Sequence, residues 1–358
     1  MNILHITYPL SNGGIGTMLP YIANKQCENN IVTIIIISDI ISKEKLNVLD
    51  KRIKIIKLNR KTGSFSPIPF IKFNHLIYNS NADIYHFHSG EISKYLFPFI
   101  WNKIKKKSCV TLHSAPFNMK QLKKSRLKYF QHRYAISEAI KEQLTSVCNL
   151  DSKIVLNGVN TNNFIQKKDN DKNPFKIIQI SRLLHKMKGQ DILLKAVSIL
   201  KVQGFHNIDI TFLGGNGTSQ PFLEKLAKDY NILNNVHFVT PKPHFYIEQH
   251  LCDFNLLIQP SRFEPFGLTI AEGMAAKTPI LVSDIPAPME IINQGECGFY
   301  FKSEDPNDCA EKIKNIIQNG YDENMLEKAY QRVTELYSVD KTATKYLEEY
   351  KNIKSSFL

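Results

Sequence analysis

The sequence predicts an α/β fold made of two Rossmann-like, doubly wound domains. Short apolar, β-branched runs alternate with helical patterns along the chain, which is typical of parallel sheets flanked by helices. A polar segment rich in helix-breaking residues interrupts this alternation at residues 166–174. The 358 residues exceed one ordinary domain, and each half is long enough to bury its own core. We therefore expect domains at residues 1–165 and 175–335, joined by a linker at 166–174.

The first half contains five runs that have the pattern of buried strands. They are apolar and rich in β-branched residues, as expected for strands covered on both faces. The runs are residues 3–7, 31–38, 54–58, 84–88 and 109–113. Helical patterns lie among and after them, for example at residues 17–24 and 122–129.

The second half repeats the alternation. Strand-like runs occupy residues 176–180, 208–213, 236–239, 254–258 and 279–282. Helical patterns around them cover residues 191–202, 220–230, 268–276 and 306–318. A last helical pattern, at residues 340–353, lies in a C-terminal segment, residues 336–358, that we treat separately.

The composition indicates a globular cytoplasmic protein. Hydrophobic residues make up 43% of the chain and charged residues 22%. The longest largely apolar run, residues 31–37, is too short to span a bilayer, and the chain leads from Met1 straight into a strand pattern, so we expect no leader. Six scattered cysteines form no Cys-x-x-Cys pair, and we expect buried thiols rather than disulfides or a metal site.

All of the positive excess lies in the first half. Residues 1–170 carry 25 Lys and Arg against 10 Asp and Glu, whereas residues 171–358 carry 21 against 23. In the segment 120–129, leucines and a tyrosine interleave with Lys123, Lys124 and Arg126, as in a basic amphipathic surface helix. We expect contact with an anionic membrane and no nucleic acid, because no nucleic-acid-binding module is present. A solvated basic surface is the alternative.

Two acids, Glu264 and Glu272, frame a tight turn that opens the helical pattern at 268–276. Backbone N–H groups at a helix start can bind an anion, and each of the two acids can hold one end of the same ligand. The segment therefore suits a ligand with hydroxyls at both ends and phosphate in the middle. A nucleotide-sugar is such a ligand. For a lone acid, a solvated carboxylate or compensation of the helix dipole would be the simpler interpretation. The turn and helix start comprise Pro265, Phe266, Gly267, Leu268 and Thr269.

Two cations, Arg182 and Lys188, follow the strand pattern at 176–180. A cationic loop at a strand end suits a diphosphate whose charge grows as a sugar bond breaks, because fixed cations stabilise that developing charge. Arg can bind two oxygens at once, and Lys acts as a point charge. Taken alone, the pair could equally be an exposed basic loop.

Read together, Arg182, Lys188 and the Glu-x7-Glu segment from Glu264 to Glu272 resemble the donor site of retaining GT-B glycosyltransferases of family four. These are mostly bacterial enzymes of cell-surface polysaccharide, capsule and lipopolysaccharide assembly. The resemblance implies a GT-B fold, with ligands bound where strand ends of the two domains meet across a cleft. It also implies that the C-terminal segment, residues 336–358, packs back on the first domain.

The resemblance further implies the reaction. We expect transfer of a sugar from a nucleotide-sugar, UDP-linked by expectation, to a saccharide or lipid-linked saccharide with retention of anomeric configuration. No metal and no other cofactor is expected. The enzyme would work at the inner face of the cytoplasmic membrane as a peripheral protein.

Residue roles follow from the same resemblance. Glu272 would accept hydrogen bonds from the ribose hydroxyls and Glu264 would lie near the sugar, while His113 would reach the transferred sugar. We expect His113, Arg182, Lys188 and Glu264 to be catalytic. Further donor contacts are expected from the small or strand-end residues Gly14, Gly16, Gly214 and Thr240.

His86 and His88 share one face of a predicted strand and are assigned to the acceptor side, with Lys123, Lys124 and Arg126. A metal pair is possible on their spacing, but the sequence offers no evident third ligand, and packing is the plain alternative.

Three other interpretations stay open at this point. Gly14 and Gly16 could begin a dinucleotide fingerprint with Asp39 as its ribose acid, although Leu19 stands where the third glycine belongs. The chain could be a nucleotide-sugar epimerase of the same layout. It could also be a basic membrane- or RNA-binding protein with a degenerate site.

Overall fold

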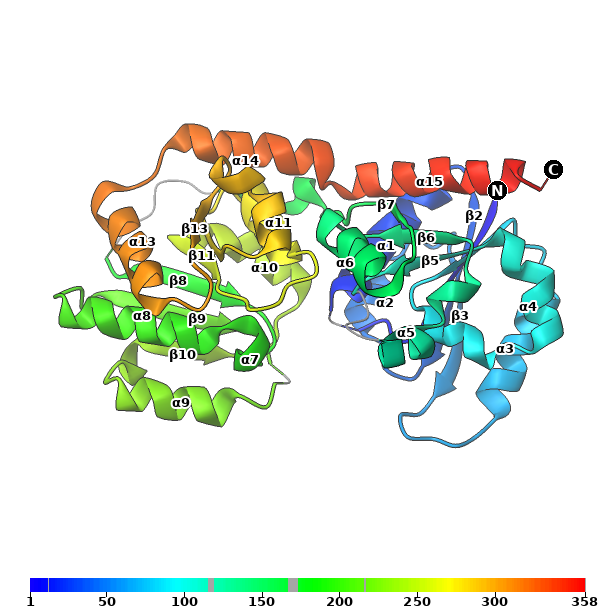
Figure 1. The fold of residues 1–358 in the computed structure, drawn as a ribbon, viewed down its shortest axis with the longest axis horizontal. Helices are drawn as coiled ribbons and strands as arrows, with labels where there is room; N and C mark the ends of the chain where they lie inside the picture. The colour runs from blue at the N-terminus through cyan, green and yellow to red at the C-terminus, as the bar shows by residue number, and fades with distance from the viewer. Residues whose placement is uncertain (12, 115–118, 167–172, 216, 358) are drawn as a thin grey trace. The chain divides into compact units, whose positions relative to one another are not determined.

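A computed structural model of the chain describes residues 1–11, 13–114, 119–166, 173–215 and 217–357. It contains two compact units, one made of residues 1–158 and 338–358 and the other of residues 159–337 (Figure 1). Each unit is built on a parallel sheet with helices around it. The predicted α/β class, with two Rossmann-like domains, is therefore confirmed.

The first unit holds a seven-stranded sheet in the order β3-β2-β1-β4-β5-β6-β7, with every pair parallel. The five strands predicted for this half are present. Two more, β6 and β7, escaped prediction because they are short and carry charged or polar residues. The strands are β1 Asn2–Thr7, β2 Ile31–Ser38, β3 Lys54–Arg60, β4 Ile84–Phe87, β5 Ser108–Leu112, β6 His132–Ala135 and β7 Lys153–Ile154.

Helices and 3-10 turns connect these strands. One prediction is wrong: residues 122–129 do not form a single helix, because Arg126 adopts a left-handed backbone with φ of 57° and separates α5 from a 3-10 turn. The helices are α1 Gly14–Cys27, α2 Lys43–Val48, α3 Ile68–Tyr78, α4 Pro98–Ile104, α5 Met119–Ser125, α6 Glu138–Cys148 and α15 Val339–Ser355. The 3-10 turns of the first unit are η1 Gly90–Tyr95, η2 Lys105–Lys107 and η3 Leu127–Tyr129, and those of the second unit are η4 Thr161–Asn163, η5 Leu233–Asn235, η6 Leu251–Asp253 and η7 Asn293–Gly295.

Helix α15, drawn red in Figure 1, belongs to the first unit and contacts α1. Two of its tyrosines, Tyr346 and Tyr350, are buried in a core cluster that includes Ile3 of β1 and Ile84 of β4. Because these rings sit one helical turn apart, the same face of α15 covers the centre of the sheet.

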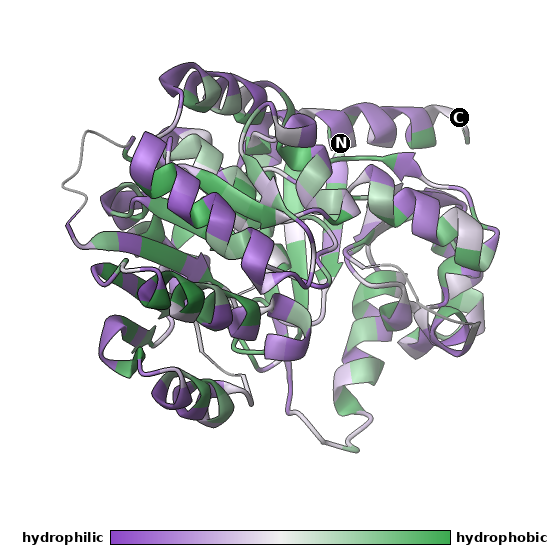
Figure 2. Ribbon diagram, turned by 60° about the vertical axis from the view of Figure 1, so that its left-hand side comes forward, coloured by the Kyte–Doolittle hydropathy of each residue, from purple (hydrophilic) through white to green (hydrophobic). Residues whose placement is uncertain are grey.

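The second unit holds a six-stranded parallel sheet in the order β10-β9-β8-β11-β12-β13. Its strands are coloured mostly as hydrophobic in Figure 2, in keeping with burial on both faces. Only β13 was not predicted from the sequence. The strands are β8 Phe175–Ile180, β9 Ile208–Leu213, β10 Val236–Val239, β11 Leu256–Gln259, β12 Ile280–Ser283 and β13 Phe299–Phe301.

The helices of the second unit pack a continuous core against this sheet, with α8 in contact with both α9 and α13. The helix that begins at Pro306 is capped by Asp305, whose side chain accepts hydrogen bonds from the Asn307 and Asp308 N–H groups. The helices are α7 His185–Lys188, α8 Gln190–Val202, α9 Gln220–Asp229, α10 His244–His250, α11 Leu268–Ala275, α12 Pro286–Ile291, α13 Pro306–Asn319 and α14 Glu323–Leu336.

The division between the units falls at residues 158 and 159, not at the expected linker 166–174. Backbone hydrogen bonds tie the intervening chain to the second unit, from the Val159 N–H to the Tyr337 carbonyl and from the Ile165 N–H to the Glu248 carbonyl. Residues 167–172 of the expected linker lie outside the described residues.

The six cysteines are buried free thiols, as predicted. None of the described helices combines the length and hydropathy of a membrane span.

Candidate functional site

The carboxyl edge of the second sheet gathers most of the predicted donor-site residues. Arg182 follows β8, Gly214 follows β9, Thr240 follows β10, and the loop with Glu264 follows β11. Because all six strands are parallel, these segments leave the sheet at the same edge. The strand order reverses between β8 and β11, and ligands of open α/β sheets bind at such a switch point.

Lys188 and Glu264 meet across that switch point. Lys188 Nζ lies 2.6 Å from Glu264 Oε2, and their side chains are only 14% and 10% exposed. The Gln179 amide donates to the Lys188 carbonyl oxygen at 2.7 Å and fixes the backbone beside the pair. The two residues were predicted to hold different parts of a ligand, and in the structure they form an ion pair with each other.

A second ion pair locks the two loops together, and the sequence had not suggested it. Arg262 donates to both carboxylate oxygens of Asp191 at 2.9 Å and to the His185 carbonyl oxygen at 2.9 Å. The bidentate geometry is the strong form of an Arg–carboxylate contact. Gly189, with φ of 68°, lies so close to the Pro260 carbonyl oxygen that an added Cβ would sit 1.8 Å from it. The loops after β8 and β11 therefore form one packed platform.

Arg182 is exposed beside this platform. Its carbonyl oxygen accepts a hydrogen bond from the Gln190 amide at 3.0 Å, which orders the backbone. Within the described residues, its guanidinium makes no hydrogen bond or ion pair. Its five donors are thus available to a ligand.

Glu272 lies on α11 and is buried. Its Oε1 is 2.9 Å from His244 Nε2, and the other ring nitrogen of His244 is 3.0 Å from Glu248 Oε1. A histidine between two buried carboxylates holds Glu272 in a fixed orientation and leaves its second oxygen outside this contact. His244 begins α10 just after β10, so the strand-end rule that selected Arg182 could also have selected it.

The turn before α11 has the shape that an anion site needs. Gly267, with φ of 114°, is the N-cap residue of α11, a conformation that favours glycine. Leu268 and Thr269 occupy the first positions of the helix, where N–H groups have no acceptor within it. The adjoining ring of Phe266 is buried and packs edge-on against Tyr337 at 5.7 Å. The predicted helix at 268–276 is confirmed to within one residue.

Gly214 and Thr240 flank the edge. Gly214 has φ of 140°, and an added Cβ would lie 2.1 Å from the Ser181 carbonyl oxygen, so a larger residue cannot occupy this position unstrained. The Gly214 N–H donates to the Val239 carbonyl oxygen at 3.1 Å. Thr240 is exposed.

The remaining predicted site residues lie in the first unit. Gly14 and Gly16 lie in the first turn of α1, and an added Cβ on Gly16 would lie 1.8 Å from the Ser11 carbonyl oxygen. The glycine therefore permits a close backbone approach within the protein itself.

His86 and His88 are buried, with ring nitrogens bonded to protein groups, so their expected contact with an acceptor is not supported. His86 Nδ1 lies 2.5 Å from the Tyr350 hydroxyl and its Nε2 lies 2.7 Å from Thr111 Oγ1. Burial holds the pKa of both histidines well below the ordinary range.

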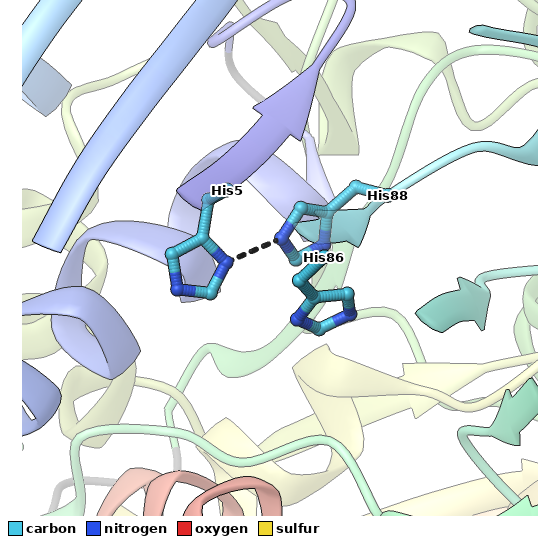
Figure 3. Close-up of side chains that lie close together, drawn as sticks. All are labelled: His5, His86 and His88. Atoms are coloured by element: carbon cyan, nitrogen blue, oxygen red, sulfur yellow. Dashed lines mark hydrogen bonds between the residues drawn. The ribbon is translucent and has the colours of Figure 1, made fainter. Parts of the chain in front are cut away.

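His5 of β1 lies beside His86 and His88 (Figure 3). The sequence pattern had not indicated this third histidine. It stands opposite His86 in the parallel register of β1 and β4, and this pairing is what brings the three rings together. Ligand atoms of the three lie within 4.8 Å of one another, a spacing that could hold a metal ion. His88 Nδ1 in turn lies 3.4 Å from Nε2 of His113, which follows β5 and is half-buried.

The basic segment around α5 is partly folded into the protein. Lys123 and Lys124 are exposed, and Lys124 lies 3.9 Å from Glu91. Arg126 stacks on the Tyr129 ring at 4.5 Å. The leucine of α5 in this segment, Leu122, is buried in the unit rather than presented outward, so the expected amphipathic face is already covered.

A family model described as "Glycosyl transferases group 1" matches residues 160–333. The chain is 27% identical over 235 residues to an uncharacterized glycosyltransferase of Methanocaldococcus jannaschii, an alignment that covers 60% of this chain and 58% of that protein. It is 25% identical to an uncharacterized 41.2 kDa protein in the cps region of Klebsiella pneumoniae, covering 87% and 88%.

It is also 26% identical to the O-antigen chain mannosyltransferase RfbU of Salmonella typhimurium, covering 55% and 54%. The chain thus spans little more than half the length of two of these three relatives. Among solved structures, Anabaena HepE in complex with UDP and glucose superposes with a TM-score of 0.80 over 98% of this chain and 99% of that one, at 18% identity. That likeness confirms the GT-B fold expected from the sequence.

Proposed function

We propose that this chain transfers a sugar from a nucleotide-sugar to a saccharide or lipid-linked saccharide acceptor, because residues 160–333 match the family model described as "Glycosyl transferases group 1". One observation carries the proposal. The exposed Arg182, the Lys188–Glu264 pair and the Glu272–His244 pair all lie at the carboxyl edge of one parallel sheet, around its switch point.

Arg182 and Lys188 bind the diphosphate of the donor. Arg182 has a guanidinium with no partner among the described residues, and a guanidinium suits two phosphate oxygens. Lys188 is held 2.6 Å from Glu264, so it is already oriented before a donor binds. As the bond between the sugar and the phosphate breaks, negative charge grows on the leaving diphosphate, and these fixed cations stabilise it without a metal cofactor.

Glu272 binds the ribose. The carboxylate is buried, and its Oε1 lies 2.9 Å from His244 Nε2. The other oxygen can accept hydrogen bonds from vicinal hydroxyls, and the rigid contact with His244 reduces the entropy lost on binding. Leu268 and Thr269 N–H groups at the start of α11 bind the phosphate next to the sugar.

Transfer proceeds with retention of the anomeric configuration. Glu264 is paired with Lys188 and Glu272 with His244, so neither carboxylate is placed as an unpartnered nucleophile for a covalent sugar intermediate. The oxygen of the acceptor hydroxyl attacks from the face that the diphosphate leaves, and its proton passes to an oxygen of that diphosphate. UDP is the proposed nucleotide, because Anabaena HepE, which shares the fold, is described in complex with UDP and glucose.

The acceptor belongs to cell-surface polysaccharide, capsule or lipopolysaccharide assembly. The relatives support this, since one is an O-antigen chain mannosyltransferase and another is a protein of a cps region. The first unit would meet an anionic membrane on the cytoplasmic side through exposed aromatic rings. Phe97 and Phe99 are 47% and 62% exposed, and the lysine turn η2 follows α4 directly.

A turnover panel tests the proposal. The purified chain is incubated with UDP-, GDP- and ADP-sugars, with and without lipid-linked saccharides extracted from bacterial membranes, and released nucleoside diphosphate is measured. Acceptor-dependent release supports transfer. Conversion of the donor sugar without acceptor would instead identify an epimerase, and no turnover with any donor would leave a binding protein.

A further inference from the structure

The ring nitrogens of three histidines in the first unit form a continuous chain that starts at a glutamine. Gln26 Oε1 of α1 lies 2.7 Å from His5 Nε2, and His5 Nδ1 lies 3.1 Å from His88 Nε2 (Figure 3). His88 Nδ1 continues the chain to His113 Nε2 at 3.4 Å, at the long end of a hydrogen bond. Gln26, His5 and His88 are buried, and only His113 is partly exposed.

These histidines are neutral near pH 7. Burial lowers the pKa of His5 and of His113 to about 4, and it holds the pKa of His88 well below its ordinary value. A neutral imidazole carries one proton, so each ring has one donor nitrogen and one acceptor nitrogen. The protonation of one ring nitrogen therefore determines that of its neighbour along the chain.

The glutamine sets the direction in which the hydrogen bonds of the chain run, from donor to acceptor. Its amide oxygen can only accept, so His5 donates through Nε2 and leaves Nδ1 as an acceptor. His88 then donates through Nε2 to His5, and its own Nδ1 accepts from His113 Nε2. The last ring is left with Nδ1 unprotonated, and within the described part of the chain this nitrogen has no hydrogen-bond partner.

The scaffold that holds the chain is rigid. His5 and His88 lie on or directly after the adjacent strands β1 and β4, and the His88 N–H donates to the Ile6 carbonyl oxygen at 2.9 Å. His113 follows β5, the next strand of the sheet. Such backbone pairing fixes the ring positions without help from a ligand.

A metal ion is the competing explanation for three clustered histidines. Both nitrogens of His86, however, face hydroxyls, those of Tyr350 and Thr111. Both nitrogens of His5 and of His88 are also engaged within the chain. A metal ligand needs a lone pair that points at the ion, and here every ring nitrogen of the three already has a protein partner.

We propose that Gln26, His5 and His88 are positioning residues that fix His113 as the Nε2-protonated tautomer, so that its Nδ1 accepts a hydrogen bond from a hydroxyl of the transferred sugar. The contact with the sugar rests on the proposed function. The tautomer itself does not depend on it, because it follows from the hydrogen bonds within the first unit.

The tautomers are measured directly by nuclear magnetic resonance on the full chain labelled with ¹⁵N-histidine, with a His113→Gln variant to assign that signal. All three rings should carry the proton on Nε2 in the wild type at pH 8. His113 protonated on Nδ1 overturns the proposal. One equivalent of bound zinc, found by metal analysis of the protein, overturns it as well, because an ion would replace the protons of the chain.

Three variants then test the role of the glutamine. Gln26→Met removes the acceptor at similar volume, and we expect mixed His113 tautomers and a kcat about tenfold lower with an unchanged KM for the donor. Gln26→Glu at pH 8 keeps an acceptor at that position and should restore the single tautomer. Thr111→Val, which removes a hydroxyl that contacts His86 and Tyr346 but no member of the chain from Gln26 to His113, is the matched control and should change neither quantity.

The outcomes separate the two proposals. A single His113 tautomer that persists in Gln26→Met overturns the positioning role, whatever the enzyme does. If the tautomers respond as expected but the wild type transfers no sugar, the proposed function fails while the hydrogen-bonded chain stands.

Discussion

The Lys188–Glu264 pair gives the sharpest quantitative test of the site. At 2.6 Å and an effective dielectric constant of about 20, two unit charges attract by about 6 kcal/mol, part of which offsets the cost of removing both groups from water. A pair that is only 14% and 10% exposed should therefore keep a coupling energy of about 2 kcal/mol. Exposed pairs give less than about 1 kcal/mol.

The assay is a double-mutant cycle in urea unfolding followed by circular dichroism. Lys188→Met and Glu264→Gln should each destabilise the protein by about 3 kcal/mol, because each leaves a buried group without its partner. The double variant should cost about 2 kcal/mol less than the two single costs together. Lys186→Met, an exposed neighbour on the same short helix, is the control and should change stability by less than about 0.5 kcal/mol.

A coupling energy below about 0.5 kcal/mol would refute the reasoning, since it would show a loose surface contact rather than a preorganised pair. The same variants carry a kinetic expectation. Lys188→Met should lower kcat by about 100-fold or more, because a fixed cation facing the leaving diphosphate is lost.

Three further predictions concern the backbone, the buried histidines and the surface. Gly189→Ala should lower the free energy of unfolding by more than about 3 kcal/mol, because at φ of 68° its Cβ would overlap a carbonyl oxygen. Gly204→Ala, at φ of 92° in open space, should lower it by about 1 kcal/mol. Equal losses of stability in urea unfolding would contradict this. The His5 pKa is lowered from 6.5 to about 4, so between these pH values the unfolded chain binds a proton that the folded chain does not. The free energy of unfolding should therefore fall as the pH drops through that window, by about 3 kcal/mol from this histidine at pH 4, and a flat profile would count against its burial as a neutral ring. Replacing Phe97 and Phe99 by Ser should weaken flotation with anionic vesicles, and unchanged flotation would remove these rings from the membrane contact.

The sequence alone located the candidate site residues that directly follow predicted strands. Arg182 and the turn from Glu264 to Gly267 directly follow apolar runs, and in a parallel sheet such positions meet at one edge without further information. Their contacts with partners distant in sequence could not be foreseen in the same way. The pairing of Glu272 with His244 joins α11 to the start of α10, a contact between segments that no local pattern encodes.

The other differences between the expected and the observed structure also arise from features that a local sequence pattern does not show. Arg126 interrupts a pattern that looks helical, because its backbone is left-handed, and the residue pattern of the segment does not show this. His5 joins His86 only through the parallel register of β1 and β4, and period-two spacing along one strand cannot show a ring on its neighbour. The division between the units falls before the polar segment because the chain from Val159 to Ile165 is already hydrogen-bonded to the second unit, and composition does not reveal such contacts.

Isothermal titration of nucleoside diphosphates tests most directly whether the second unit holds the donor. UDP, GDP and ADP are titrated into the wild type, Glu272→Ala, Arg182→Ala and the exposed control Glu311→Ala. One of them, UDP by expectation, should bind the wild type at one site per chain. Its affinity should fall at least about tenfold in Glu272→Ala and in Arg182→Ala, which is equivalent to about 1.4 kcal/mol. The affinity should be unchanged in the control. Wild-type affinity in both Glu272→Ala and Arg182→Ala, or no binding of any of the three nucleotides, would contradict the assignment.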